Sequence, residues 1–221
     1  VHTSTTLAII PMGSGNGLAE KLSIPKKIVD AIKLINQAHQ KAIDVLQVND
    51  LYAFSVAGYG FGAAVSHHFA STHKRGFFEY LRVGIYEAWY NVPQTYTISC
   101  NGKTTKVYAD MLDFSNSGWY GYDIAIHPEM LIDDGLFDVS VVKHFPLWKS
   151  AYMFILLAMG RISSSKYYLG ISTNQAVVTT DIALKTQIDG EAGPIVKKVT
   201  VTLHHLALQI LVNPCTKAIS Q

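Results

Sequence analysis

Two acidic segments in the C-terminal half of the chain carry side chains that could do chemistry. In Asp189-Gly190-Glu191, the glycine permits a tight turn from which two carboxylates project. Neighbouring negative charges raise the pKa of a carboxylate, which suits a general base that takes a proton from a hydroxyl group. The alternative interpretation of this tripeptide is a solvated hairpin turn.

The second acidic segment, Leu131-Ile132-Asp133-Asp134-Gly135-Leu136-Phe137-Asp138, places carboxylates beside a glycine. Carboxylate and backbone carbonyl oxygens are hard ligands that suit Mg²⁺, so the segment could hold a magnesium ion. An acidic turn leading into a strand over residues 137–142 is the alternative.

A glycine-rich loop near the N-terminus, Gly13-Ser14-Gly15-Asn16-Gly17, could contact an anion. It lies between an apolar run over residues 7–10, which we expect to be a buried parallel strand, and a helix expected over residues 18–22. The loop matches neither G-x-x-x-x-G-K-[ST], G-x-G-x-x-G nor the serine elbow G-x-S-x-G. A phosphate contact and a plain strand-to-helix turn therefore both remain open.

The elements that must position these segments are mostly strands. Runs rich in Val, Ile, Tyr and Thr predict strands, and Asn101-Gly102 between two of them is a strong hairpin signal. Many short strands with few helices indicate an antiparallel sandwich or barrel. The expected strands are 43–48, 51–57, 95–100, 104–114, 137–142, 176–180, 183–188, 199–203 and 206–212, and the longer helices are 27–38, 78–90 and 148–159.

The composition argues against several other classes of protein. A formal charge of +2 is too small for a nucleic-acid binder that relies on a basic surface. The longest apolar run, residues 151–160, is about half of the ~20 residues that a membrane span requires. Two cysteines, Cys100 and Cys215, do not make a disulfide framework. No secretory signal opens the sequence, so we expect a cytoplasmic protein. From the small net charge we expect no nucleic-acid partner.

Taken as a whole, the string over residues 10–19, IPMGSGNGLA, resembles the P-x-G-[ST]-x-N signature of the diacylglycerol, sphingosine and ceramide kinase superfamily. The resemblance runs from Leu7 to about Pro214. It implies that ATP is the phosphate donor and that Ser14 contacts it, with Gly13 and Asn16 shaping the loop.

The same resemblance assigns roles to both acidic segments. The D-G-E turn of the family implies that Glu191 accepts the proton of the lipid hydroxyl, with Asp189 supporting it or sharing the role. The L-x-x-D-G string implies a structural Mg²⁺ held by the side chain of Asp134 and the backbone carbonyls of Leu131 and Leu136.

The sequence departs from the family in two places. In Gly58-Tyr59-Gly60-Phe61-Gly62, which resembles G-x-G-F-D-A, Gly62 stands where an aspartate is usual, so a tight turn is the favoured interpretation. The family's G-G-D-G-T loop, which cradles the ATP phosphates, does not occur. We therefore expect little kinase activity from this chain alone, because phosphoryl transfer depends on positioning and charge neutralisation.

These observations predict a mainly β protein with three parts: a short α/β remnant of a nucleotide-binding domain over residues 1–41, an antiparallel β-sandwich with substrate and catalytic residues over 42–213, and a tail over 214–221. The implied partners are a membrane lipid substrate, transient contact with a membrane surface, and a second copy in a homodimer. Two alternatives remain open, namely a non-catalytic lipid-binding or regulatory sandwich and a relative of the NAD kinases.

Overall fold

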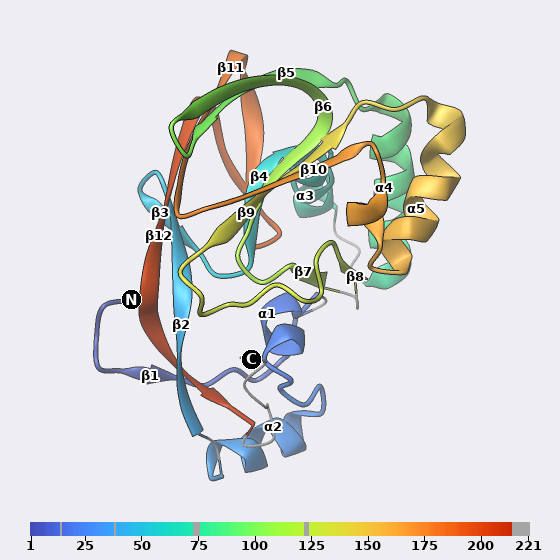
Figure 1. Ribbon diagram of the computed structural model, residues 1–221. Helices are drawn as coiled ribbons and strands as arrows, with labels where there is room; N and C mark the ends of the chain where they lie inside the picture. The colour runs from blue at the N-terminus through green and yellow to red at the C-terminus, as the bar shows by residue number, and fades with distance from the viewer. Residues whose placement is uncertain (14, 38, 73–75, 122–123, 214–221) are drawn as a thin grey trace.

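Antiparallel strands dominate the computed structural model, which describes residues 1–13, 15–37, 39–72, 76–121 and 124–213 (Figure 1). None of the helices in these ranges reaches the length and sustained hydropathy of a bilayer-spanning segment. The helices are α1 (Gly17–Lys21), α2 (Ile28–Ile35), α3 (Phe61–Ser71), α4 (Phe77–Tyr90) and α5 (Ser150–Ala158), with 3-10 turns η1 (Leu147–Lys149) and η2 (Ile162–Ser164). The strands are β1 (Thr6–Leu7), β2 (His39–Val48), β3 (Leu51–Ala53), β4 (Val56–Gly60), β5 (Gln94–Cys100), β6 (Lys103–Ser115), β7 (Trp119–Gly121), β8 (Ile124–Ala125), β9 (Phe137–Lys143), β10 (Tyr168–Thr173), β11 (Gln175–Ile188) and β12 (Glu191–Val212).

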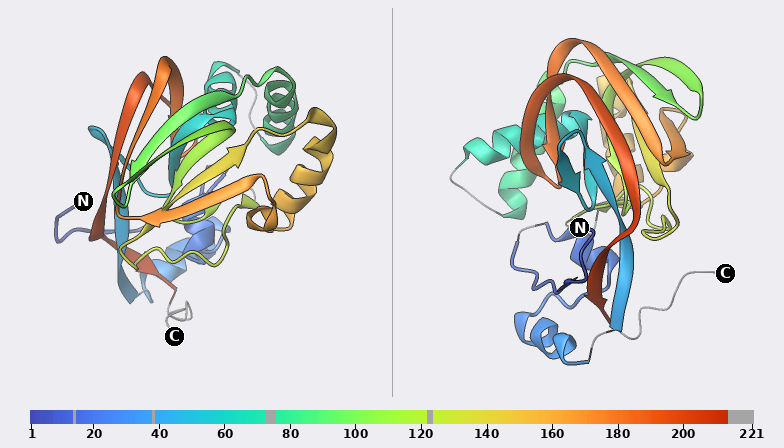
Figure 2. Two further views of the ribbon diagram at one scale, coloured as in Figure 1. Left: turned by 45° about the horizontal axis from the view of Figure 1, so that its top comes forward. Right: turned by 90° about the vertical axis from the view of Figure 1, so that its left-hand side faces the viewer.

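One strongly curved sheet forms the body of the molecule (Figure 2). Its strands follow the order β10-β9-β6-β4-β11-β12-β2-β3. The long strands β6 and β11 flank β4 at one end and β5 at the other, so the sheet folds over on itself. This architecture confirms the mainly β, antiparallel fold that the sequence predicts.

The core lies inside this curl because side chains alternate between the two faces of each strand. On β5, Tyr96, Ile98 and Cys100 are buried while their neighbours are more exposed. Phe114 on β6 and Phe137 on β9 meet edge to face at 6.3 Å between ring centroids. A separate cluster around Val142 and Met153 attaches α5 to the outer side of β9.

The Asn101-Gly102 hairpin is confirmed, with φ angles of 50° and 70° that join β5 to β6. Other strand expectations need correction. The strand expected at residues 7–10 does pair in parallel, with β12, but its length and its burial are wrong, because β1 covers only Thr6–Leu7 and Leu7 is 45% exposed. The four predicted C-terminal strands are two long ones, β11 and β12, since bulges bend them without ending them.

A buried carboxylate on β2 joins three separate segments. Asp44 has no solvent exposure. Its Oδ1 atom accepts hydrogen bonds from Leu206 N at 2.7 Å and pairs with His205 Nδ1 at 2.8 Å, at the irregular part of β12. Its Oδ2 atom accepts a hydrogen bond from Gly135 N at 2.8 Å, in the acidic turn before β9. Asp44 therefore fixes that turn against the sheet.

We expect Asp44→Ala to lower the free energy of unfolding by about 3 kcal/mol, because it removes a fully buried carboxylate and leaves the N–H groups of Gly135 and Leu206 without this acceptor. Urea denaturation measures this change. Asp50→Ala, at an exposed carboxylate in the turn after β2, is the matched control and should stay within about 0.5 kcal/mol of the parent. Equal midpoints for the two variants would contradict a structural role for Asp44.

Candidate active site

The Asp189–Glu191 turn connects β11 to β12 and is held by its first carboxylate. Asp189 and Gly190 have φ angles of 49° and 86°, and the turn itself lies at the surface. The Asp189 carboxylate is directed at the chain between β3 and β4, where it accepts hydrogen bonds from the N–H groups of Phe54, Ser55 and Val56 at 2.8, 2.7 and 3.0 Å. Loss of water raises the pKa of Asp189, and these three bonds oppose the rise.

Glu191 differs from Asp189 in its surroundings. It is the first residue of β12 and is exposed, and its side chain forms no hydrogen bond or ion pair with a described residue. The Asp189 carboxylate thus binds the backbone, while the Glu191 carboxylate is exposed to solvent.

The acidic turn brings the three predicted metal ligands to one hollow. Leu131, Asp134 and Leu136 all line a hollow of about 160 Å³. Asp134 is exposed, and its Oδ1 accepts a hydrogen bond from Leu136 N at 3.0 Å. Two neighbouring carboxylates have side-chain partners: Asp133 pairs with Lys41 at 2.9 Å, and Asp138, which lines the same hollow, contacts His127 and Ser172. No group of three or more His, Cys, Asp or Glu residues in the described part of the chain has a metal-binding arrangement.

Asn16 organises the glycine loop. Its Oδ1 accepts a hydrogen bond from Gly13 N at 3.1 Å, and its Nδ2 donates to Gly13 O at 2.7 Å. Asn16 has a φ angle of 56° and directly precedes α1. Gly13 and Asn16 therefore shape the loop as the sequence predicts, whereas Ser14 lies outside the described residues.

Polar contacts tie these segments to one another. Lys21 on α1 donates hydrogen bonds to the carbonyl oxygens of Pro128 and Met130, just before the acidic turn. Its partial burial lowers its pKa, and nearby Lys41 lowers it further. Ser55, which binds Asp189 through its N–H, donates its hydroxyl to Trp119 O on β7 at 2.9 Å, and α1 packs against β7 (Figure 1).

Asp113 is a site residue that the sequence analysis missed. It is fully buried on β6, and its Oδ2 accepts a hydrogen bond from Tyr120 OH at 2.7 Å. Its Oδ1 has no hydrogen-bond partner of good geometry among the described residues. Burial raises the pKa of Asp113 to about 7, an effect that Tyr120 and the neighbouring Gln187 side chain reduce. The only sequence signal is one acidic residue inside the apolar run Met111-Leu112-Asp113-Phe114.

Gln187 links Asp113 to the Asp189–Glu191 turn. Its Oε1 accepts a hydrogen bond from Gly190 N at 2.9 Å. Gly58 on β4 lies between Gln187 and Asp113 in the sheet, and a Cβ atom there would stand 1.9 Å from Asp113 Oδ1. The predicted tight turn at residues 58–62 thus needs correction: β4 runs through Gly58, and only Gly60, with φ 78°, breaks the chain direction before α3.

Residues 119–122 form an aromatic stretch, Trp119-Tyr120-Gly121-Tyr122. Tyr120 points inward to Asp113, and Tyr122 lies outside the described residues.

Comparison with known proteins identifies the family. Residues 55–212 match the model of the YegS C-terminal NAD kinase β-sandwich-like domain, and residues 1–48 match the diacylglycerol kinase catalytic domain. The chain belongs to the diacylglycerol kinase family of lipid kinases. This confirms the resemblance drawn from the glycine loop and the two acidic turns.

Individual relatives agree with this assignment. A YegS-like lipid kinase of Shewanella frigidimarina is 26% identical over 94% of this chain and 67% of its own length. The diacylglycerol kinase of Bacillus subtilis is 24% identical over 85% of this chain and 63% of its own, and a YegS-like lipid kinase of Chromohalobacter salexigens is 28% identical over 65% and 47%. This chain thus spans about half to two thirds of these relatives.

Solved structures show the same fold. A crystal structure of a diacylglycerol kinase from Bacillus anthracis superimposes with a TM-score of 0.71 at 18% identity, covering 97% of this chain and 69% of that one.

The position of Asp113 makes stability depend on pH. Its pKa is raised from 3.8 to about 7 in the folded protein, so between these values the folded chain keeps a proton that the unfolded chain has lost. The free energy of unfolding therefore falls as pH rises through this window.

Asp113→Asn has no carboxyl group to titrate at this position, so it does not lose stability in this way. Its free energy of unfolding minus that of the parent should therefore increase by about 1 kcal/mol or more between about pH 5 and about pH 8. Urea denaturation at both pH values measures it. Asp181→Asn, at an exposed carboxylate on β11, should have the same free energy of unfolding as the parent at both pH values. Parallel curves for Asp113→Asn and the parent would refute the shifted titration.

Proposed function

We propose that a protein containing this chain transfers the γ-phosphoryl group of ATP to the hydroxyl of a membrane lipid alcohol, such as diacylglycerol or a sphingoid base. The observation that carries this proposal is the difference in surroundings between the two carboxylates of the Asp189–Glu191 turn. Three backbone amides hold Asp189, and Glu191 remains exposed beside it without a protein partner.

The proposed reaction assigns one proton transfer to this chain. Glu191 takes the proton of the lipid hydroxyl while the hydroxyl oxygen forms a bond to the γ-phosphorus. The bond from that phosphorus to the bridging oxygen of ADP breaks, and ADP leaves with the electron pair. Gly13, Ser14 and Asn16 contribute the nucleotide contact, with Ser14 assigned by the family motif alone.

The residues at the acidic turn fit a magnesium ion with a structural role. Asp134 offers a second carboxylate oxygen that accepts no hydrogen bond from a described residue, and Leu131 and Leu136 line the same hollow. A bound Mg²⁺ would supply positive charge that holds this turn in one conformation. The hydrogen bond from Gly135 N to Asp44 already orients the turn toward the sheet.

Phosphoryl transfer tests the proposal directly. We expect no transfer from ATP to diacylglycerol or sphingosine by the 221-residue chain alone, because it lacks the G-G-D-G-T phosphate loop. A fusion with the N-terminal part of the Bacillus subtilis diacylglycerol kinase should restore transfer. In that fusion, Glu191→Gln should reduce the rate by about a hundred-fold or more.

Asp181→Asn on the same hairpin is the matched control and should keep the rate of the parent fusion. A fusion that binds lipid without transferring phosphate would favour the non-catalytic lipid-binding alternative. Phosphorylation of NAD in place of lipid would favour the NAD kinase alternative.

Magnesium binding is tested by thermal unfolding of the chain without any catalysis. Saturating Mg²⁺ should raise the melting temperature by about 2 °C or more, since an ion that binds only the folded state stabilises it. Asp134→Ala should abolish this rise. Asp133→Ala should retain it, because Asp133 pairs with Lys41. An equal response in both variants would exclude Asp134 as a ligand.

A further inference from the structure

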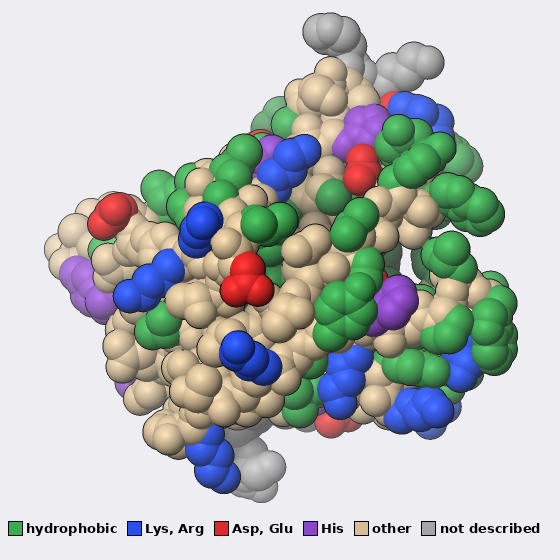
Figure 3. Space-filling view, turned by 90° about the horizontal axis from the view of Figure 1, so that it is seen from above, with side chains coloured by type: hydrophobic (Ala, Val, Ile, Leu, Met, Phe, Trp, Pro, Cys, Tyr) green, Lys and Arg blue, Asp and Glu red, His purple; other side chains and the backbone are tan. Residues whose placement is uncertain are grey.

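Helix α5 exposes an apolar surface that the rest of the described chain leaves uncovered. All of its residues are uncharged, yet only Met153 among them is buried. Trp148 just before it is 78% exposed, and Ile155 on it is 55% exposed. A helix that is hydrophobic all round is ordinarily buried in a core or in a membrane. Figure 3 shows hydrophobic side chains gathered on the flank where α4 and α5 lie.

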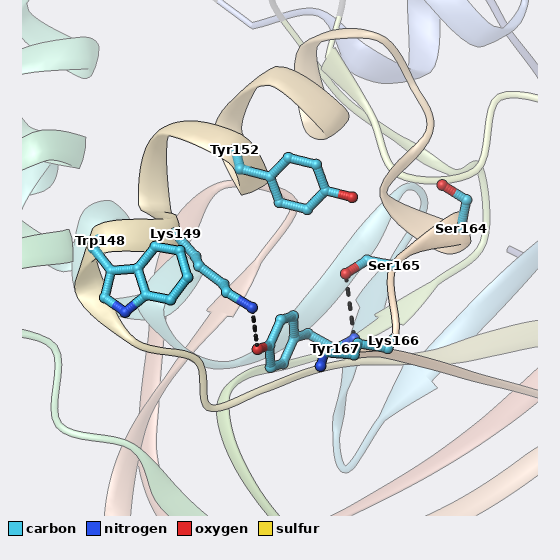
Figure 4. Close-up of a pocket in the computed structure, with 7 residues that line it drawn as sticks. All are labelled: Trp148, Lys149, Tyr152, Ser164, Ser165, Lys166 and Tyr167. Carbon is cyan, nitrogen blue, oxygen red and sulfur yellow. Dashed lines mark hydrogen bonds between the residues drawn. The ribbon is translucent and has the colours of Figure 1, made fainter.

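A basic hollow of about 450 Å³ adjoins this helix, between η1, α5 and η2 (Figure 4). Its lining contains Lys149 and Lys166 and no described carboxylate. Lys149 Nζ donates to Tyr167 OH at 2.9 Å, and the two ammonium groups lie 5.0 and 5.4 Å from the centroid of the Tyr167 ring. The two lysines thus converge on one aromatic side chain at the mouth of the hollow.

The segment over residues 139–180, which contains α5 and this hollow, carries only positive formal charges. Between Asp138 and Asp181 the sequence has no acidic residue, while it has Lys143, Lys149, Arg161 and Lys166. Exposed Trp, Tyr and Phe side chains next to lysines are typical of protein surfaces that lie in the interface of an anionic bilayer.

Two other occupants fit this surface less well. The remainder of the diacylglycerol kinase catalytic domain would continue from residues 1–48, and α2, the exposed helix of that segment, lies at the opposite end of the molecule from α5 (Figure 1). Helix α2 exposes apolar residues of its own there, such as Val29. A second copy packed symmetrically on α5 would bring like charges together, since the segment has no acidic partner to offer.

We infer that α5 with Trp148 forms a docking surface for anionic lipid bilayers, in which the hollow between Lys149 and Lys166 takes a lipid phosphate. The apolar side chains of α5 enter the interfacial region, and the two lysines meet the headgroups. This inference rests on the proposed function only in that a lipid kinase has to reach its substrate in a membrane. Docking itself requires neither ATP nor transfer.

Sedimentation of the full chain with vesicles tests the inference. The chain should bind vesicles of phosphatidylcholine mixed with phosphatidylglycerol, and bind those of phosphatidylcholine alone at least about ten-fold more weakly. Lys149→Gln with Lys166→Gln should weaken binding to the mixed vesicles by about five-fold for each lysine. Arginine at both positions should restore it, because the charge returns.

Apolar variants separate insertion from simple charge attraction. Trp148→Ala with Ile155→Ala should weaken binding to both kinds of vesicle. The matched controls lie on β12: Lys197→Gln with Lys198→Gln for charge, and Ile195→Ala for apolar exposure. These should bind as the parent does, and circular dichroism checks that every variant is folded.

Several results would overturn the docking surface. They are failure of the parent chain to sediment with mixed vesicles, unchanged binding by the double lysine variant, and binding of inorganic phosphate without any binding of vesicles. A dimer in solution that Trp148→Ala dissociates would assign the surface to a second copy. Phosphorylation of a detergent-dispersed lipid by the fusion protein needs no docking, so its outcome judges the proposed function separately.

Discussion

The hydrogen bonds of the Asp189 carboxylate constrain much of the candidate site. Three consecutive N–H groups, of Phe54, Ser55 and Val56, turn toward one side chain, and this turn separates β3 from β4. The same carboxylate fixes the position of the β11–β12 turn, so the direction of Glu191 follows from it. Ser55 then carries the constraint to β7 through the bond from its hydroxyl to Trp119 O. A carboxylate that accepts three backbone hydrogen bonds is a rigid anchor, because each bond restricts its orientation.

Two other carboxylates, those of Asp44 and Asp113, are fully buried and differ in how far they are hydrogen-bonded. Asp44 is fully satisfied and holds the acidic turn, so it contributes stability and orientation together. Asp113 is incompletely satisfied, and burial raises its pKa to about 7, which makes it a source of instability in neutral solution. Asp113 contacts the Gln187 side chain, which accepts a hydrogen bond from Gly190 N. These contacts link the buried Asp113 carboxyl group to the turn that presents Glu191. Unsatisfied buried charge of this kind is more common near functional sites than in structural cores.

Two exposed apolar surfaces lie at different ends of the molecule, and we expect them to meet different partners. Helix α2 exposes apolar residues within the segment that matches the catalytic domain of the family, so another part of that domain suits it. Helix α5 belongs to the sandwich and is surrounded by lysines, so an anionic bilayer suits it better. A kinase acting on a lipid needs both surfaces at once, one toward the nucleotide and one toward the membrane. Their separation at opposite ends keeps the two contacts from competing (Figure 1).

The sequence by itself determined the features that depend on local spacing. Alternating β-branched residues define the strands, Asn101-Gly102 defines a hairpin, and the family motifs locate the glycine loop and the two acidic turns. The proposed domain boundaries and the role of Ser14 stay predictions. Only the tertiary structure decided that β11 and β12 run through their bulges and that Asp189 binds the backbone while Glu191 is exposed. It also decided that Asp113 is buried and that α5 is exposed. Each of these depends on contacts between residues far apart in the chain, and hydrophobic periodicity records which face of an element is apolar but not what will cover it.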